Sequence, residues 1–508
     1  MRKCLCLLLC LCVLVSLSGC TATARTPGTR VSVTLPPVVS HYEAPQDDSD
    51  LTKQSIVALY LPSRDGQRLL AQYAELPLRA GVSAAETVVR TLLAFPANAD
   101  VTSLGGNVTI GLFGSHPVEV SGSVCTVNLS ASTLQLDYDQ RYTLFLALAS
   151  TLGGVGDIRF VNVLIADQAA SLDISGNLAA GSVTAHPGEE LPVLWDQMDA
   201  RRTPLGNDPA QQLLTSVATL YFPLADGSGF VPEARNLTFP GQTARQMTRG
   251  LLEALSAGAQ FTEGTVQMPD VDGLMTQEPD VSELADGGRM VTLHFSSDLG
   301  ARLSLIGLDV EAFVGSLAYT IMSYVPAVGA VRMYSGPTLI TSLGSRSFAD
   351  GVQRRRQYQD LLMDQTTIYL SSGDRLVPVL RSLPADAADD PRSLLALMML
   401  GANETEQAAG IRSTLPAGMD ASDVLGVSIV GDTMLLNLSP RFERLIRQAG
   451  PDTERQLCYS MVSTLCRAMG LRRVQFFFDG QMPDTLGGSL SWSGEFLLNN
   501  ALIDQNLG

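Results

Sequence analysis

The sequence predicts an α+β fold built from three tandem small α/β-sandwich domains. Three observations support this prediction: a strand–turn–strand opening occurs three times, a stretch with helical spacing follows each opening, and each copy then reaches an alternating strand that ends in Ser. The separation between the opening Tyr and that Ser is 70, 75 and 70 residues, from Tyr60 to Ser130, Tyr221 to Ser296 and Tyr369 to Ser439. Spacing this regular indicates a triplicated domain.

Each repeat is predicted to run strand, turn, strand, helix, strand, helix, strand. The first helices are expected at residues 84–95, 243–257 and 390–400. The Ser-terminated strands alternate apolar and polar side chains, which is typical of a strand with one buried face. The second helices carry apolar residues at spacings of four, and therefore on one stripe. Last strands are expected at residues 160–165, 331–334 and 474–478, so that each repeat forms a small sheet with helices packed on one face.

The repeats divide the chain into seven segments. A signal peptide is expected at residues 1–19, a tether at 20–51, domains at 52–195, 214–343 and 364–508, and polar links at 196–213 and 344–363. The polar links predict three domains with separate cores. The tail after Gly487 contains Trp492 and other apolar residues, and we expect it to dock on the third domain.

Composition and charge limit the classes of partner. The 508 residues suffice for about three domains of ordinary size, and 45% hydrophobic against 17% charged residues is typical of globular domains. A net charge of −17 disfavours nucleic acid as a main partner, because nucleic-acid binding needs clustered Lys and Arg. The one basic cluster, Arg354-Arg355-Arg356, is interpreted as a solvated linker or helix face.

The N-terminus predicts a secretion signal. Arg2 and Lys3 precede an apolar run over residues 5–15, which is too short to span a bilayer permanently. The following Leu-Ser-Gly-Cys resembles a bacterial lipobox, and the resemblance implies cleavage between Gly19 and Cys20 with a diacylglycerol on the Cys20 sulfur. The alternative is an ordinary signal peptide with a stray Cys. The lipid would be the only membrane attachment and would place the protein on the extracytoplasmic face of the bacterial membrane.

The tether and the cysteines carry weaker signals. Residues 47–50 read Asp-Asp-Ser-Asp, and we interpret them as solvated tether in preference to a weak calcium site. Three cysteines, Cys125, Cys458 and Cys466, lie beyond the signal and Cys20. Cys458 and Cys466 are eight residues apart on one predicted helix, about 12 Å, which is too far for a disulfide. All three are expected to be small buried hydrophobes.

No constellation of residues predicts catalysis, a cofactor or a metal. His186 with Glu189 and Glu190 resembles a metal corner, but it lies in a Pro-Gly loop. The run Gly153-Gly154-Val155-Gly156 resembles a phosphate cradle, but its position between helix and last strand favours a helix C-terminal turn with positive φ. We interpret the repeated tyrosines, Tyr60, Tyr221 and Tyr369, as buried or half-buried strand residues in preference to a platform for ligand binding. The histidines show no metal-ligand spacing: His41, His116, His186 and His294.

The repeated Leu-Tyr-[Leu/Phe] opening, the hydrophobic strand with Pro, and a helix of the 246–255 type resemble the GerMN domain, most closely in residues 217–240 and 243–258. The chain is therefore similar to bacterial lipoproteins of the GerM-like sporulation and spore germination family, here with three tandem copies. The resemblance implies a domain similar to ring-building modules and a non-enzymatic role in assembling an envelope complex. It transfers no active-site residue.

Two classes of function follow. The first is an extracytoplasmic adaptor or scaffold that holds other envelope or sporulation-complex proteins, because repeated modules add contact area and avidity. The second is a lipoprotein that binds cell-wall glycan or a small ligand, which requires a concave site with aromatic and polar groups. Only Trp195 and Trp492 are available as indole platforms for sugar stacking. An enzyme of unrecognised type is the third and least favoured possibility.

Overall fold

The computed structural model describes residues 42–48, 50–79, 84–173, 177–186, 191–193, 202–205, 208–285, 287–488 and 490–504. Residues 42–508 belong to one compact unit. The expected signal peptide, its cleavage site at Gly19 and Cys20, and most of the tether lie outside the described residues.

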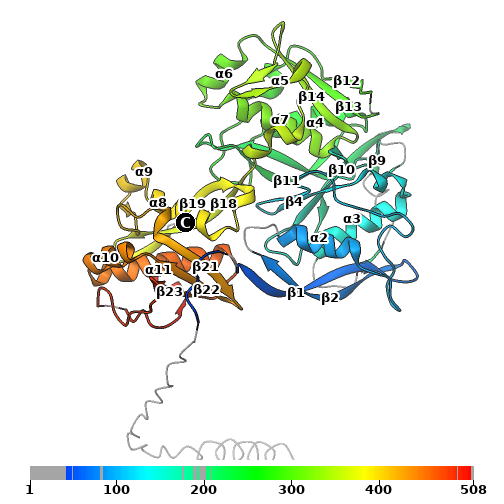
Figure 1. Ribbon diagram of the computed structural model, residues 1–508. Coiled ribbons are helices and arrows are strands. Elements are labelled where there is room, and N and C mark those ends of the chain that lie inside the picture. The colour runs from blue at the N-terminus through cyan, green and yellow to red at the C-terminus, as the bar shows by residue number, and fades with distance from the viewer. Residues whose placement is uncertain are drawn as a thin grey trace, which may run out of the picture. The chain divides into compact units, whose positions relative to one another are not determined.

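Three repeats of strands and helices follow one another along the chain (Figure 1). The first contains β1 (Thr52–Pro62), β2 (Arg68–Arg79), α2 (Ala84–Ala94), β3 (Val118–Ser121), β4 (Val124–Leu129), η1 (Ala131–Gln135), α3 (Tyr138–Leu152), β5 (Phe160–Ile165), β6 (Gln168–Ala169), β7 (Val183–Thr184) and β8 (Leu191–Pro192). The second contains β9 (Arg202–Leu205), β10 (Asp208–Pro223), β11 (Phe230–Phe239), α4 (Ala244–Ser256), α5 (Val271–Leu274), β12 (Asp280–Glu283), β13 (Arg289–Phe295), α6 (Leu299–Leu305), α7 (Val310–Tyr324), β14 (Val328–Ser335) and β15 (Thr338–Leu339). A connector with β16 (Ser342–Leu343), β17 (Arg346–Ser347), η3 (Ala349–Gly351) and η4 (Arg355–Leu361) precedes the third.

The third repeat repeats this order up to the C-terminal tail. It contains β18 (Met363–Ser372), β19 (Arg375–Pro384), η5 (Ala385–Ala387), α8 (Pro391–Leu400), α9 (Glu404–Ala408), β20 (Ile411–Arg412), η6 (Ala421–Asp423), β21 (Val424–Val430), β22 (Thr433–Leu438), α10 (Pro440–Ala449), α11 (Pro451–Ala468), β23 (Arg473–Phe478), β24 (Phe496–Leu497) and η7 (Asn500–Leu502). The predicted helices and Ser-terminated strands are confirmed, most of them to within one residue at each end.

Each repeat contains two sheets, where the sequence predicted one. The opening strands form an antiparallel hairpin, β1–β2, β10–β11 or β18–β19. The remaining strands form a mixed sheet whose central pair is parallel, with Val127 beside Val163, Leu293 beside Met333 and Leu436 beside Phe476. A further strand, β3, β12 or β21, lies antiparallel at one edge of each mixed sheet. The α+β class is thus confirmed, and the sheet arrangement is a correction.

The long helix of each repeat is tied to the hairpin by the same hydrogen bond. The amide N–H of Tyr60, Tyr221 or Tyr369 donates to the Oγ1 of Thr151, Thr320 or Thr464, at 2.9, 3.0 and 3.1 Å. All three Tyr are buried strand residues, as predicted. A strand amide that points away from its hairpin partner needs an acceptor when it is buried, and the helix hydroxyl supplies it.

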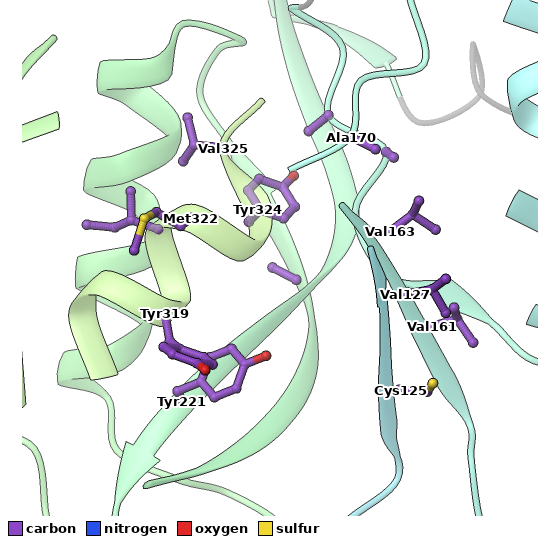
Figure 2. Close-up of a cluster of buried hydrophobic side chains, with 14 of the residues drawn as sticks. Cys125, Val127, Val161, Val163, Ala170, Tyr221, Tyr319, Met322, Tyr324 and Val325 are labelled. Carbon is purple, nitrogen blue, oxygen red and sulfur yellow. The ribbon is translucent and has the colours of Figure 1, made fainter. Parts of the chain in front are cut away.

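The first two repeats share one hydrophobic core, which contradicts the prediction of three separate cores. Buried residues from Val57 to Leu362 form one continuous cluster. Figure 2 shows Cys125, Val127 and Val161 of the first repeat in the same cluster as Tyr221 and Tyr324 of the second. The third repeat has a core of its own, which includes Leu51 from before β1. Only the third repeat therefore has a core separate from that of the other two repeats.

The predicted links are structured where the structure describes them. Arg202–Leu205 is strand β9 and pairs with β10, which begins at Asp208, inside the expected first link. The second link is packed in place by Phe348 and Tyr358, both buried in the core of the second repeat. In the second link, the Arg354 and Arg355 side chains form hydrogen bonds with distant parts of the chain, Gly329 and Glu119.

Helix α7 lies almost entirely inside the second repeat, with most of its residues buried. Within the described ranges, no single helix is both long and apolar enough to cross a membrane; α6 and α7 meet the criteria together only as a pair bent by 104°.

Candidate functional site: the junction of the three repeats

Arg355, from the basic cluster of the connector, lies at the centre of the contact between the first two repeats. Its side chain is 5% exposed, and its guanidinium donates to Oε2 of Glu119 in β3 at 2.6 Å. It also donates to the hydroxyl of Ser323 in α7, and its Cζ lies 3.9 Å from the ring centroid of Tyr319. The interpretation of residues 354–356 as solvated is therefore wrong for Arg355, although Arg356 is exposed.

The electrostatics of this contact favour a permanent charge on Arg355. Burial is the largest effect and by itself lowers the pKa of the guanidinium, but the Glu119 carboxylate together with Tyr221 and Tyr319 holds the pKa above its usual value. Glu119 receives a second hydrogen bond from Nε2 of Gln359, at 2.7 Å. Burial also raises the pKa of the neighbouring Tyr319 hydroxyl. The junction is thus a closed polar network that joins β3, η4 and α7.

The third repeat contacts the first repeat through Ser121 and Gly122, which follow Glu119 closely in the sequence. The hydroxyl of Ser121, at the end of β3, donates to the carbonyl oxygen of Met363, the first residue of β18. The amide N–H of Gly122 donates to Oδ1 of Asp364 at 2.9 Å. Burial raises the pKa of Asp364, against the opposing effect of the hydrogen bonds from Gly122 and Gln365. One edge of the first repeat therefore contacts both the connector and the third repeat.

A depression of about 200 Å³ lies beside this network. Its floor is the outer face of the first mixed sheet, where Asn128 exchanges hydrogen bonds with Asp167, at 2.7 and 3.1 Å. Its rim is formed by the loop that contains Phe113, 40% exposed, and His116, whose Nδ1 lies 3.1 Å from the Ser115 hydroxyl. Its lining residues are Phe113, Gly114, Ser115, His116, Pro117, Glu119, Thr126, Asn128, Leu164, Asp167, Arg355, Arg356 and Gln359.

The other sequence candidates do not meet at this site. His294 stacks on Tyr334 in the second repeat, with ring centroids 4.6 Å apart. His186 is described but Glu189, Glu190, His41 and Trp195 lie outside the described residues, so the metal corner stays an untested alternative. In the ranges that the structure covers, no three His, Cys, Asp or Glu side chains gather as a metal site.

The Gly-rich run and the cysteines have structural roles. Gly153 ends helix α3 with φ −62°, and Gly156 has a positive φ, so the predicted helix C-terminal turn is confirmed. Cys125, Cys458 and Cys466 are free and buried, as predicted. Burial raises the pKa of all three thiols, to about 12 for Cys466.

The third repeat matches a known protein family in sequence. Residues 367–484 match the family described as Germane: Sporulation and spore germination. The third repeat is similar to this family, and the match spans less than half of the chain. The match lies within the predicted domain 364–508 and confirms for this repeat the GerMN resemblance.

Two solved structures are similar to the chain. The tandem GerMN domains of the sporulation protein GerM from Bacillus subtilis are 16% identical, cover 60% of this chain and 98% of their own, and have a TM-score of 0.23. A putative lipoprotein from Clostridium perfringens is 18% identical, covers 27% of this chain and 89% of its own, and has a TM-score of 0.19. The comparison with curated proteins gave no match.

The third repeat also contacts residues 42–48 and 50–51, which we call the N-terminal strap. Oδ1 of Asp48 accepts hydrogen bonds from Arg392 and from the Val427 amide, both at 3.0 Å. The carbonyl oxygens of Pro45 and Asp50 accept from Asn437 Nδ2 and the Ile429 amide, at 2.9 Å each. The expectation that residues 47–50 are solvated tether is therefore wrong for Asp48, whose side chain is bound, whereas Asp50 is exposed and is held only through its backbone carbonyl. Sequence reasoning missed this contact because Arg392 lies 344 positions away from Asp48.

The C-terminal tail docks on the third repeat, as predicted. Trp492 is fully buried, packs edge-on against Phe476 and Phe478, and donates from its indole Nε1 to Oε1 of Glu454 at 2.8 Å.

Proposed function

We propose that this chain is a non-enzymatic sporulation or spore germination protein that acts as an adaptor in the assembly of a complex in the cell envelope. The observation that carries the proposal is the contact of the Germane-like third repeat with the first, through Ser121, Gly122 and the N-terminal strap. The Arg355 network in turn joins the first two repeats. Three repeats in contact present a composite surface, and repeated modules add contact area and avidity.

We further propose that the protein functions outside the cytoplasm. A lipid on Cys20, attached at the site of cleavage between Gly19 and Cys20, would anchor it to the membrane. The apolar run at residues 5–15 and the Leu-Ser-Gly-Cys sequence support this location. The experiment is fractionation of cells that carry Cys20→Ala. We expect the variant to leave the membrane pellet, because two or more acyl chains provide the stable anchoring. Full retention in the pellet would contradict the lipid anchor.

The adaptor role is tested by capture of the tagged full chain from crosslinked membranes of its host during sporulation. We expect defined envelope proteins to be retained at stoichiometric levels and to be absent when the tag alone is used. Binding of the chain to purified peptidoglycan in a pelleting assay, with no protein retained after crosslinking, would contradict the adaptor role.

The second candidate is binding of cell-wall glycan or a small ligand. The depression beside Arg355 favours it, because Phe113 offers an exposed ring next to the polar side chains of Asn128 and Arg356. This candidate predicts that Phe113→Ala weakens peptidoglycan pelleting and leaves protein capture unchanged.

A further inference from the structure

The hairpin of the first repeat exposes two large side chains on one face. Ile56 in β1 is 77% exposed and Tyr73 in β2 is 76% exposed. Tyr73 lies opposite Ala58 in the antiparallel register, and Ile56 lies two residues before Ala58, so the two side chains project from the same face as near neighbours. Single exposed apolar residues need no explanation, but this pair lies beside a strand edge.

Along the edge of β1 that faces away from β2, the described residues provide no backbone partner strand. The Tyr60 amide points away from β2, because it donates to Thr151 of helix α3. Backbone groups alternate in direction along a strand, so the N–H and C=O groups of Ala58 and Ile56 point to the same side as the Tyr60 amide. No hydrogen bond from another repeat reaches Ala58 or Ile56 in the part of the chain that the structure covers. Such an edge accepts an added strand.

In the second repeat, the corresponding edge of β10 is occupied by another segment of the chain. Val217 precedes Tyr221 by four residues, as Ile56 precedes Tyr60. The carbonyl oxygen of Val217 accepts from the amide N–H of Ser182 at 2.8 Å, and the Ser182 hydroxyl lies 2.9 Å from the hydroxyl of Thr219. The Gly-Ser pair that occupies this edge leads directly into strand β7, Val183–Thr184.

The occupying segment must have a small residue at its closest point. Gly181 has φ +65°, and a Cβ placed on it would lie 2.6 Å from the Val217 carbonyl oxygen. Gly therefore allows the segment to approach the strand edge, and Ser182 then forms the backbone hydrogen bond. An extended segment with a Gly-Ser pair fits this type of edge.

We propose that the free edge of β1, flanked by Ile56 and Tyr73, binds an extended Gly-Ser-containing segment of a partner polypeptide. The segment donates a backbone N–H to the Ile56 carbonyl oxygen, as Ser182 donates to Val217, and packs an apolar side chain on Ile56 and Tyr73. A second copy of this chain is disfavoured as the occupant, because copies with a net charge of −17 repel each other. The proposal rests on the adaptor function and assigns one of its contact surfaces.

The probe is a fluorescent peptide with the sequence of residues 179–186, Ala-Ala-Gly-Ser-Val-Thr-Ala-His, titrated with the full chain by fluorescence anisotropy. We expect saturable binding within the range up to about 1 mM, where weak segment recognition is measured. Ile56→Lys should weaken binding about tenfold or more, as expected for an anchor residue at an interface. Leu305→Lys is the matched control, because Leu305 is 86% exposed and lies at the end of α6.

A second peptide, N-methylated at the Ser that corresponds to Ser182, separates strand addition from nonspecific apolar contact. Strand addition requires that N–H, so N-methylation should also weaken binding about tenfold. The proposal is wrong if no saturable binding occurs, or if Ile56→Lys and N-methylation both leave the affinity unchanged. It is also wrong if the wild-type chain self-associates in analytical ultracentrifugation and Ile56→Lys abolishes this, because a second copy is then the occupant.

The two proposals fail separately. If the full chain captures its partner in crosslinked membranes and Ile56→Lys captures it equally well, the adaptor function stands and the β1 edge is not its contact. If the wild-type chain captures no partner, the adaptor function fails, whatever the peptide result.

Discussion

Arg355 and Glu119 form a buried ion pair at 2.6 Å although they lie 236 positions apart in the sequence. The pair joins the connector to the first repeat, while the same guanidinium contacts Ser323 and Tyr319 of the second. A buried charge that loses its partner remains desolvated, so the contact between the first two repeats depends on both residues.

We predict that Glu119→Ala lowers the free energy of unfolding of the first two repeats by about 3–5 kcal/mol, because it leaves Arg355 buried and unpaired. Urea denaturation of the full chain measures this change. Asp298→Ala is the control: it breaks the pair with Arg302, in which both side chains are about half exposed (50% and 51%), and exposed pairs contribute little. Equal effects of the two variants would contradict a structural role for the Arg355 network.

We predict that Thr320→Val destabilises the second repeat by about 1–3 kcal/mol, because it leaves the buried Tyr221 amide without an acceptor. Thr320→Ser restores the hydroxyl and should recover most of that loss. Hydrogen exchange at Tyr221, followed by mass spectrometry of the peptide that contains it, should be faster in the Val variant than in the Ser variant. Unchanged exchange in Thr320→Val would show that the amide has another acceptor.

We predict a pH-dependent gain in stability for Asp364→Asn. Because burial raises the pKa of Asp364 in the folded state, the folded chain binds more protons than the unfolded chain at pH values between the two pKa values. The contribution of Asp364 to the free energy of unfolding therefore falls as the pH rises from about 3.9, the ordinary pKa of Asp, through the raised pKa of the folded state.

In Asp364→Asn the amide oxygen still accepts from the Gly122 N–H, but the buried charge is gone. Thermal unfolding should show the variant more stable than the wild-type chain at pH 7 and equally stable near pH 3. A variant that is less stable at pH 7 would indicate that the charged carboxylate is required at the contact between β3 and β18.

We predict that a buried charge has different consequences in the two cores. Leu436→Asp should unfold the third repeat alone, because Leu436 belongs to the separate core of that repeat. Val161→Asp should unfold the first and second repeats together, because Val161 belongs to the core that they share. Each substitution buries an unpaired carboxylate, which costs several kcal/mol and is comparable with the stability of a domain.

Limited proteolysis with mass spectrometry distinguishes these outcomes. A protected third repeat after Val161→Asp, and protected first and second repeats after Leu436→Asp, are the expected results. Degradation of all three repeats after Leu436→Asp would contradict the separation of the cores.

The sequence predicted the local elements well because their signals are local. The alternation of residues 124–130 and the spacing of the apolar residues on α3, α7 and α11 depend only on which side chains face the core. Asp390 and Thr243 cap the helices that were expected to begin there, since each side chain accepts hydrogen bonds from amides of the first helical turn.

The contacts between repeats were not predictable in the same way. A charged residue in a polar stretch, such as Arg355 or Asp48, is solvated unless a residue from a distant part of the chain contacts it. The neighbouring sequence does not indicate which residue that is. Glu119 and Arg392 supply these partners from 236 and 344 positions away. The Gly-Ser pair at residues 181 and 182 carried no signal either, because its function depends on the edge of β10.

The central claim is that this chain holds a partner through its surfaces and not through one reactive polar residue. Capture from crosslinked membranes tests it with two full-length variants: one with alanine at His116, His186, Glu189 and His294, and one that lacks residues 364–508. We expect the alanine variant to retain the partner at the wild-type level and the deletion to lose it. Loss of the partner in the alanine variant with the fold intact, or its retention after the deletion, would contradict the adaptor function.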